Sequence, residues 1–242
     1  MRTNDTVCQM LAKYKGHRKR NDTSDIMRDI TEKEAFLMVD FYQFIVQPLV
    51  EGCSRVCLSK LAERANRCEE SVRWPTGMEE TRLFRGLYRF QLPCNLFGTT
   101  HLGTQYIDFD TKQVFRLYLL RFHHWELAEI VCVYEFARRK YIQAFKVLCA
   151  KEEKPLGRQL VDLPVDGSDS YYGHILHGTI SRGLELLNFL HFSVQDEDHL
   201  VRVIPSQMAY PAGEPFQHHF FYNITDDFVC RFWYEDSVPR IK

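Results

Sequence analysis

The strongest constraint on the fold lies between Leu127 and Leu148, where apolar residues recur at helical spacing. The apolar positions are Leu127, Ile130, Val131, Tyr134, Ala137, Tyr141, Phe145 and Leu148. An α-helix brings such positions onto one face, because residues three and four apart lie on successive turns. Glu126 and Glu129 lie near its start and Arg138–Lys140 further along, which suits the helix dipole. The segment therefore predicts a long amphipathic helix packed along an apolar core.

Other stretches of the chain show similar periodicity and predict further helices. These stretches are Thr31–Leu49, Val56–Arg67, Met78–Leu92, Lys112–Arg121 and Tyr171–Phe192. Thr31 and Glu34 have the spacing of a capping box, in which each side chain satisfies a free backbone N–H of the other residue. Apolar residues surround much of the first of these helices, so we expect it to lie deep in the domain. Pro48 and Pro93 lack the N–H that a helix needs, so each predicts a kink or an end.

The connecting segments divide the chain into three parts. We expect residues 1–24 to be a basic, flexible segment and residues 25–204 to be one helical domain. Residues 205–242 form a tail rich in proline and aromatic residues, which we expect to pack on the domain; its pattern leaves the secondary structure open. The acidic run Asp196–Asp198 is typical of a solvated loop, and Pro205 of a turn. Together the segments predict a mainly α fold, a single irregular multi-helix bundle.

Composition excludes several classes of protein. Hydrophobic residues make up 45% of the chain and charged residues 26%, proportions typical of a globular protein with a buried core. The net charge is −1, so no overall field attracts the chain to nucleic acid or an anionic membrane. No apolar run is long enough to span a bilayer, and the first residues lack the apolar core of a secretory signal. We therefore expect a cytoplasmic or nuclear location.

The eight cysteines are interpreted as reduced thiols packed as small hydrophobic residues. Most of them lie inside apolar, helix-like stretches, and the chain shows no secretory signal. Cys53 and Cys57 are one helical turn apart, but no second pair completes a zinc site. We therefore expect both to be ordinary core residues.

Histidine is the residue type that comes nearest to a catalytic pattern. His174 and His177 have a spacing that metal ligands on one helix face use, but no Glu completes a zinc-hydrolase motif. The pairs His123–His124 and His218–His219 consist of neighbours whose side chains point in different directions. No nucleotide-binding or serine-hydrolase motif occurs in the sequence. We therefore predict no catalytic, cofactor-binding or metal-binding residue, and the alternative is a metal-dependent enzyme built from a histidine cluster.

The segment Thr81–Gly98 contains the most distinctive surface pattern. Its apolar residues recur at helical spacing, whereas Arg82, Arg85 and Arg89 fall on another, solvent-facing side. The interpretation that we favour pairs these arginines with acidic residues on the same or a neighbouring helix. The alternative is a docking stripe for an acidic protein, because arginine is enriched at interface hot spots.

The corner at His123, His124 and Trp125 is a second candidate for partner binding. The interpretation that we favour for Trp125 is a buried side chain that locks two helices together, because tryptophan is highly buried on average. A third candidate is the basic cluster Lys13–Arg20, which is typical of a solvated terminus but also of nuclear-import or nucleic-acid patches. Weak nucleic-acid binding through this cluster remains an alternative function.

Three blocks of the sequence resemble a large group of fungal helical proteins, many of which carry an N-terminal F-box. The blocks are RLFRGLYRFQLPCNLFG (Arg82–Gly98), LRFHHWELAEIVCVYEF (Leu120–Phe136) and ISRGLELLNFL (Ile180–Leu190), in the family's order. The third is a generic leucine-rich helix. The second departs from the family, because His123 and His124 replace its usual prolines. Residues 1–50 contain no recognisable F-box, a leucine-rich helical hairpin that begins with proline.

The resemblance implies a non-catalytic intracellular protein-interaction module, similar to the substrate-recognition part of fungal F-box proteins. Recruitment to a ubiquitin ligase is an implication of this kinship alone. We expect a protein partner, acidic in character, bound through the arginine face or the histidine–tryptophan corner. The residues concerned are Arg82, Arg85, Arg89, His123, His124 and Trp125.

Overall fold

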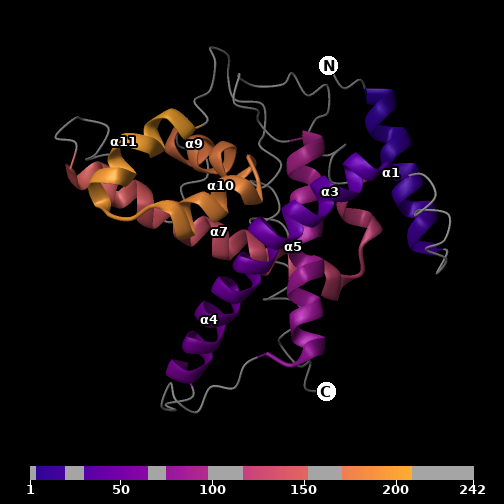
Figure 1. The fold of residues 1–242 in the computed structure, drawn as a ribbon, viewed down its shortest axis with the longest axis horizontal. Helices are drawn as coiled ribbons and strands as arrows, with labels where there is room; N and C mark the ends of the chain where they lie inside the picture. The colour runs from indigo at the N-terminus through magenta and orange to yellow at the C-terminus, as the bar shows by residue number, and fades with distance from the viewer. Residues whose placement is uncertain (1–3, 20–29, 65–74, 98–116, 152–170, 209–242) are drawn as a thin grey trace, which may run out of the picture.

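The computed structural model describes residues 4–19, 30–64, 75–97, 117–151 and 171–208 (Figure 1). The regular elements in these ranges are all helical, which confirms the predicted mainly α fold. The α-helices are α1 (Asn4–Lys19), α3 (Glu32–Phe41), α4 (Gln47–Arg64), α5 (Gly77–Phe97), α7 (His124–Lys151), α9 (Tyr171–Ile180), α10 (Leu184–Asn188) and α11 (Glu197–Gln207). Two π-helical segments, Tyr42–Val46 and Phe189–Ser193, and a 3-10 turn, Leu119–Arg121, complete the set. No helix in these ranges has the length and apolar character that crossing a membrane requires.

Helices α5 and α7 cross at the centre of the fold (Figure 1). Helix α7 also packs against α9 and α11, and α4 packs against α5. The predicted apolar stripe of α7 is buried at Leu127, Ile130, Tyr134, Ala137, Tyr141, Phe145 and Leu148. Burial of one large aliphatic or aromatic side chain contributes roughly 1.5–3 kcal/mol, so this stripe is a main source of stability. The prediction of one long core helix is confirmed.

Helix α1 corrects the expectation that residues 1–24 are flexible. It packs on the domain through Val7 and Leu11, which are one turn apart and fully buried. Tyr14, one turn further on, lies with its ring 6.3 Å from that of Phe122. Three apolar positions at helical spacing are enough to dock a short helix, and the basic cluster Lys13–Arg20 begins within it. The remaining residues of the 1–24 segment lie outside the described ranges.

Helix α3 begins as predicted but is not buried as predicted. The capping box is confirmed, because Thr31 N donates to Glu34 Oε2 at 2.9 Å and Glu34 N donates to Thr31 Oγ1 at 3.3 Å. However, α3 contains no buried residue, so the expectation that the segment Thr31–Leu49 lies deep in the domain is wrong for α3. It holds only at the end of the segment, where Val46 and Leu49 are fully buried. A cap depends on neighbours in sequence, whereas burial depends on whether another element covers the helix.

Pro93 lies inside α5 and is buried, contrary to the predicted helix break. A proline has no N–H, so the carbonyl four residues earlier, that of Arg89, loses its helical partner. The hydroxyl of Tyr118 donates a hydrogen bond to Arg89 O at 2.5 Å. A side chain from outside the helix thus replaces the missing bond, and α5 continues to Phe97.

Pro48 does not end the helix, because its missing hydrogen bond is accommodated in a similar way. The carbonyl four residues earlier belongs to Phe44, and Asn188 Nδ2 donates to it at 3.1 Å. The π-helical segment just before Pro48 has a wider hydrogen-bond pattern, in which Gln47 N donates to Tyr42 O. The chain therefore runs in helical conformation from Glu32 to Arg64 without a break.

The predicted helix Tyr171–Phe192 is interrupted between α9 and α10. Gly183 has a φ angle of +91°, a backbone conformation that residues other than glycine rarely adopt. A Cβ atom at this position would lie 2.6 Å from Gln91 Oε1. The same oxygen accepts a hydrogen bond from Leu184 N at 2.7 Å, so Gln91 of α5 caps the start of α10. The leucine pattern alone did not reveal this turn.

The acidic run that begins at Asp196 is the start of helix α11, not a solvated loop. Asp196 is the N-cap residue, and its side chain accepts a hydrogen bond from His199 N at 2.7 Å. Asp198 lies 2.5 Å from Lys151 Nζ at the end of α7. Pro205 lies in the last turn of α11 rather than in a loop. The predicted tail from residue 209 onward lies outside the described ranges.

The hydrogen bond at Pro93 leads to a prediction about stability. Tyr118→Phe leaves the buried Arg89 carbonyl without its partner, so we expect a loss of about 1–3 kcal/mol in the free energy of unfolding. Tyr141→Phe is the matched control, because the Tyr141 hydroxyl is buried without a hydrogen-bond partner among the described residues. The loss of the Tyr141 hydroxyl should leave the free energy of unfolding unchanged or slightly raised. Urea unfolding measures both; equal losses would contradict the role of the Tyr118 bond.

Candidate functional site

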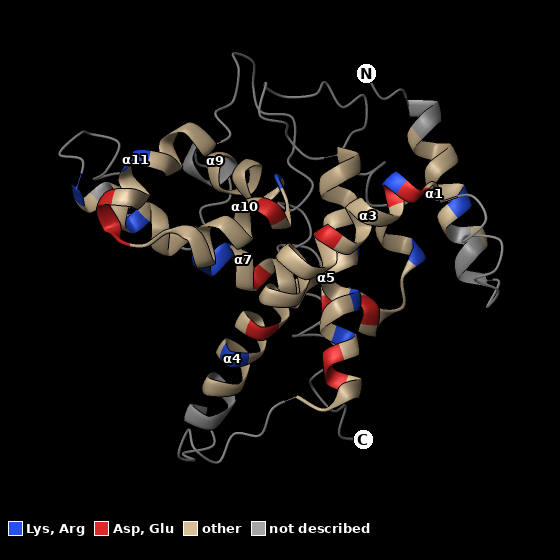
Figure 2. Cartoon of the chain, viewed as in Figure 1, with Lys and Arg blue, Asp and Glu red and all other residues tan. Residues whose placement is uncertain are grey.

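An ion-pair network joins α5 to the start of α7. Arg89 Nη2 lies 2.5 Å from Glu126 Oε1, and Arg89 Nη1 lies 2.8 Å from Glu129 Oε2. Arg85 Nη2 lies 2.7 Å from the other oxygen of Glu129. The side chains of Arg89 and Glu126 are only 11% and 3% exposed, so these charges are largely removed from water. Figure 2 shows basic and acidic positions of α5 and α7 close together at this crossing.

Glu126 also completes the first turn of α7. It is the third residue of the helix, and its Oε2 accepts a hydrogen bond from the backbone N–H of His123 at 2.9 Å. This is the carboxylate half of a capping box. Both oxygens of a buried carboxylate are therefore used, one by its own helix and one by Arg89. The hydrogen bond to His123 N explains why α7 starts here. The ion pair with Arg89 explains why the carboxylate of Glu126 is tolerated in a buried position.

Trp125 covers this network from outside rather than pinning two helices together. It is 52% exposed, so the prediction of a buried tryptophan is wrong. The guanidinium carbons of Arg85 and Arg89 lie 5.1 and 5.9 Å from its ring centroid, within cation–π range. The ring of His123 lies nearly parallel to the indole, with ring centroids 6.3 Å apart and an interplanar angle of 9°. An exposed indole is favourable here because two cations lie against it.

The arginines are therefore not a row facing solvent. Arg85 and Arg89 pair with acids of a neighbouring helix, as the favoured interpretation of the sequence proposed. Arg82 is exposed, and so are His123 and His124. The structure brings Arg85, Arg89, His123 and Trp125 together at one corner of α5 and α7. Arg82 lines a pocket with Arg85 and Trp125 beside it. Arg85 and Arg89, however, are used to hold the fold.

The histidines do not converge on a metal site in the described part of the chain. His177 is buried, and its Nδ1 lies 2.9 Å from the hydroxyl of Tyr134, with the two rings stacked. Among the described residues, no three His, Cys, Asp or Glu side chains are placed to hold a metal ion. The side chain of His174 and the pair His218–His219 lie outside what the structure describes.

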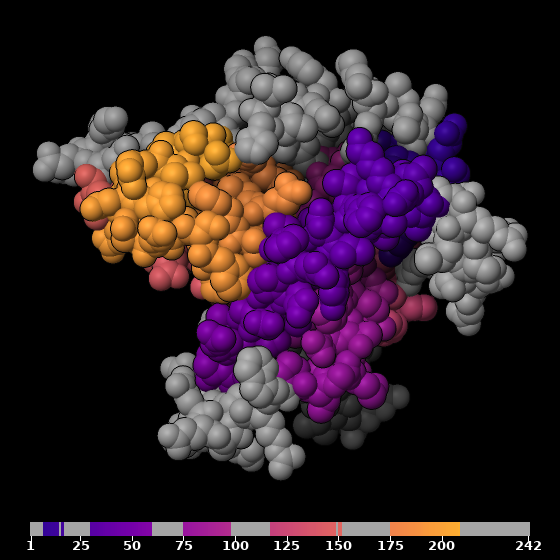
Figure 3. Space-filling view, in the orientation of Figure 1, coloured from indigo at the N-terminus to yellow at the C-terminus, as the bar shows by residue number. Residues whose placement is uncertain are grey.

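An apolar face that no other described segment covers lies on α3 and the π-helical segment after it. Its large hydrophobic residues are each between 40% and 65% exposed: Phe36, Leu37, Met38, Val39, Tyr42 and Phe44. Figure 3 shows α3 crossing the front of the molecule without cover. Two ring contacts hold it on α5, Tyr42 with Phe84 at 5.5 Å and Phe41 with Tyr88 at 6.2 Å. We call this surface the α3 face.

A groove of about 720 Å³ runs between the α3 face and α5. Phe41, Ile45 and Leu92 are apolar residues of its wall, and all three are half-buried. The charged residues that line it are Asp40 and Glu185, and no Lys or Arg is among the lining residues. The groove is therefore lined mostly by apolar residues, and the charged residues in its lining are acidic. Figure 2 shows acidic positions on α3 and α10 beside this face.

Sequence reasoning missed the α3 face because it interpreted the same residues as core. One signal was available in the sequence. A helix that is apolar on all sides has more apolar surface than one neighbouring helix covers, so it requires either several partners or an exposed face. The segment after Thr31 shows this pattern, and the structure gives it contacts on the α5 side only.

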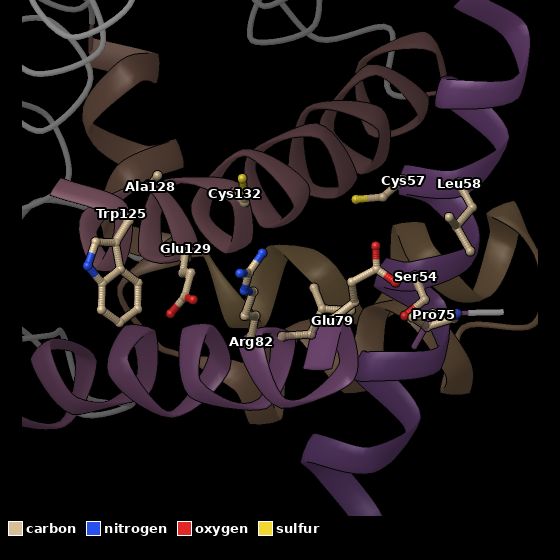
Figure 4. Close-up of a pocket in the computed structure, with 11 residues that line it drawn as sticks. Ser54, Cys57, Leu58, Pro75, Glu79, Arg82, Trp125, Ala128, Glu129 and Cys132 are labelled. Atoms are coloured by element: carbon tan, nitrogen blue, oxygen red, sulfur yellow. The ribbon is translucent and has the colours of Figure 1, made fainter. Parts of the chain in front are cut away.

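A second pocket, of about 420 Å³, lies between α4, α5 and α7. Cys57 and Cys132 line it from α4 and α7, and both residues are partly exposed to solvent (Figure 4). The expectation that Cys57 is an ordinary core residue is therefore wrong, whereas Cys53 is buried as expected. The described cysteines Cys8, Cys53, Cys57, Cys94 and Cys132 are all free thiols.

Comparison of the chain with protein-family models, curated proteins and solved structures finds no match. The resemblance to the fungal group stays a prediction. Functional inference therefore rests on the two surfaces just described, the α3 face with its groove and the pocket that contains Cys57.

The ion-pair network leads to a second prediction. Arg89→Ala leaves the buried Glu126 without its countercharge, so we expect a loss of about 3–5 kcal/mol in the free energy of unfolding. Arg82→Ala removes an exposed arginine from the same helix and should change stability by no more than about 0.5 kcal/mol. Chemical denaturation of both variants measures the difference. A loss for Arg89→Ala as small as that for Arg82→Ala would show that the network does not hold the two helices together.

Proposed function

We propose that this chain is a non-catalytic protein-interaction module whose α3 face binds an amphipathic helical segment of a partner protein. The observation that carries the proposal is that α3 buries none of its residues, although four consecutive large hydrophobic residues, Phe36–Val39, lie on it, each 48–63% exposed. Phe, Tyr and Met, the residue types enriched at the centres of protein interfaces, make up most of that surface. Large uncovered apolar patches of this kind mark interaction sites on soluble domains.

The shape of the site supports a helical occupant. The groove lies between α3 and α5, and binding of an amphipathic helix in a groove between helices is a common mode of peptide recognition. Each partner side chain that fills the groove removes apolar area on both surfaces from water. At roughly 25 cal/mol per Å² of area buried, a few anchor residues supply the driving force.

The charges at the site favour a partner segment with basic flanks. Asp40 and Glu185 border the groove, and no basic residue lines it, so Lys or Arg beside the apolar anchors would be attracted. This differs from the acidic partner that the arginine face predicted. Arg85 and Arg89 are already neutralised by Glu126 and Glu129, so they offer little attraction to an acidic protein.

The resemblance to fungal F-box proteins supports a substrate-recognition role, which we include in the proposal. The three resembling blocks correspond to α5, to the start of α7 and to the turn between α9 and α10. These elements form the framework that carries the α3 face, whereas α3 itself lies outside all three blocks. A shared framework with a separate binding surface is what a family of modules with different partners requires.

A displayed library of amphipathic peptides tests the proposal directly. The peptides keep Leu or Phe at helical spacing and vary their polar positions among Lys, Gln and Glu. We expect the wild-type chain to enrich peptides with Lys at the flanks. Phe44→Ser should weaken binding of the selected peptide at least tenfold, because the loss of one aromatic anchor contact costs about 2 kcal/mol at an interface hot spot.

Control variants separate the apolar and electrostatic contributions. Met78→Ser removes an equally exposed hydrophobic residue away from the groove and should leave the peptide affinity unchanged. Asp40→Asn combined with Glu185→Gln should preserve binding but abolish the preference for Lys over Glu, which fluorescence anisotropy measures at low and high salt. Enrichment that is the same for wild type and Phe44→Ser would overturn the proposal.

A further inference from the structure

Three thiols meet beside the pocket between α4, α5 and α7. Cys57 and Cys132 line the pocket, and Cys53 lies one turn before Cys57 on α4, fully buried. Figure 4 shows the sulfur of Cys57 pointing from α4 towards α7, above the open space of the pocket. The other lining groups are mostly apolar, among them Leu58 and Leu83. The pocket is thus a largely apolar cavity with two thiol groups in its wall.

The surroundings distinguish Cys57 from the other two thiols. A hydrogen bond from the buried Cys53 thiol and the positive charge of Arg139 lower the pKa of Cys57 to about 7, although partial burial opposes this. The same hydrogen bond, together with burial, raises the pKa of Cys53, so Cys53 stays protonated and remains a donor. Burial, the neighbouring Cys57 and the carboxylates of Glu129 and Glu135 raise the pKa of Cys132.

The charged groups around the pocket come from α5 and α7. Arg139 and Glu129 belong to α7, and Glu79 and Arg82 line the pocket from α5. Glu79 is bound to the backbone N–H of Thr76 at 2.8 Å, so its charge is partly used at the start of α5. Among these groups, Arg139 is the one whose charge acts on Cys57 to favour the thiolate.

The direction of the pKa shift distinguishes Cys57 as the more reactive thiol. A lowered pKa raises the fraction of Cys57 that is thiolate near neutral pH, and the thiolate is the nucleophile. The nucleophilicity of each thiolate falls as its pKa falls, but this offsets only part of the gain. The pKa of Cys132 is raised, so a smaller fraction of Cys132 is thiolate near neutral pH. The cluster therefore contains one activated thiol and two thiols that stay protonated.

We propose that Cys57 is a covalent modification site for apolar electrophiles of the α,β-unsaturated carbonyl class, whose hydrocarbon chain occupies the adjoining pocket. The Cys57 thiolate attacks the β-carbon, so a carbon–sulfur bond forms and the carbon–carbon π bond breaks. The electron pair moves into an enolate, which takes a proton from water at the α-carbon. Nothing leaves, and no oxidant or reductant is needed.

The pocket is what selects an apolar electrophile over a small polar one. A hydrocarbon chain attached at Cys57 has a cavity of about 420 Å³ beside it, with Leu58, Leu83 and Ala128 among its walls. Transfer of each CH₂ group from water into such a site is favourable by about 0.8 kcal/mol. A short enal gains almost none of this. This inference is independent of the binding proposed for the α3 face, because the residues that line the two sites are different.

Reaction of the full chain with two enals of different length tests the inference. trans-2-Nonenal is the apolar probe, acrolein is the short probe, and glutathione is the reference thiol in solution. Peptide mapping by mass spectrometry gives the rate of adduct formation at each cysteine. We expect the nonenal-to-acrolein rate ratio at Cys57 to exceed the same ratio for glutathione at least tenfold. The rate at Cys57 should fall as the pH is lowered through about 7, because the thiolate is lost.

Three variants complete the experiment. Cys57→Ser should abolish the preferred adduct, and Cys132→Ser, the matched thiol across the pocket, should retain it. Ala128→Leu partly fills the cavity with a good helix former, so it should slow the nonenal reaction but not the acrolein reaction. Equal length preference at Cys57 and in glutathione would overturn the inference. Unchanged nonenal labelling of the Cys57→Ser chain would overturn it as well.

Discussion

The fold depends on the pairing of one buried arginine with two carboxylates of another helix. Arg89 contacts both Glu126 and Glu129, and the three charges are nearly removed from water. Charges in such a place are tolerated only when they are paired with good geometry, so the pair fixes how α5 lies against α7. The remaining helices are arranged around these two, with α9 and α11 on α7 and α4 on α5. A shift of α5 along α7 would separate the charges and displace all of them.

Arg89 also joins a third segment to this crossing through its backbone. Pro93 frees the Arg89 carbonyl, and the buried hydroxyl of Tyr118 binds it. Tyr118 in turn packs its ring on Phe122, just before α7 begins. The side chain of Arg89 therefore fixes how α5 crosses α7, and its backbone carbonyl fixes the position of the segment that leads into α7. A proline that sequence reasoning treats as a helix break acts here as the acceptor site for a tertiary contact.

The sequence predicted those parts of the fold that depend on neighbouring residues. Helix α7 followed from its apolar stripe, and the start of α3 from the capping box of Thr31 and Glu34. The errors share a different physical origin. Whether Pro93 ends a helix, or whether Trp125 is buried, depends on groups far away in the sequence, Tyr118 in one case and the arginines of α5 in the other. A single sequence contains no direct record of those partners.

The same distinction explains why both candidate sites were missed. Apolar residues of α3 and thiols of α4 have the composition of a core, and only the absence of a covering helix in the described structure makes them a surface. Both sites lie on one continuous helical run from Glu32 to Arg64. That run is held at Gly52, where a Cβ atom would collide with His191, and at the Phe44 carbonyl, which Asn188 binds. One contact lies at the end of the α3 face and the other lies between that face and Cys57. The helical run that carries both sites is therefore anchored to the end of α10 and the segment after it, and a binding surface requires such rigid support.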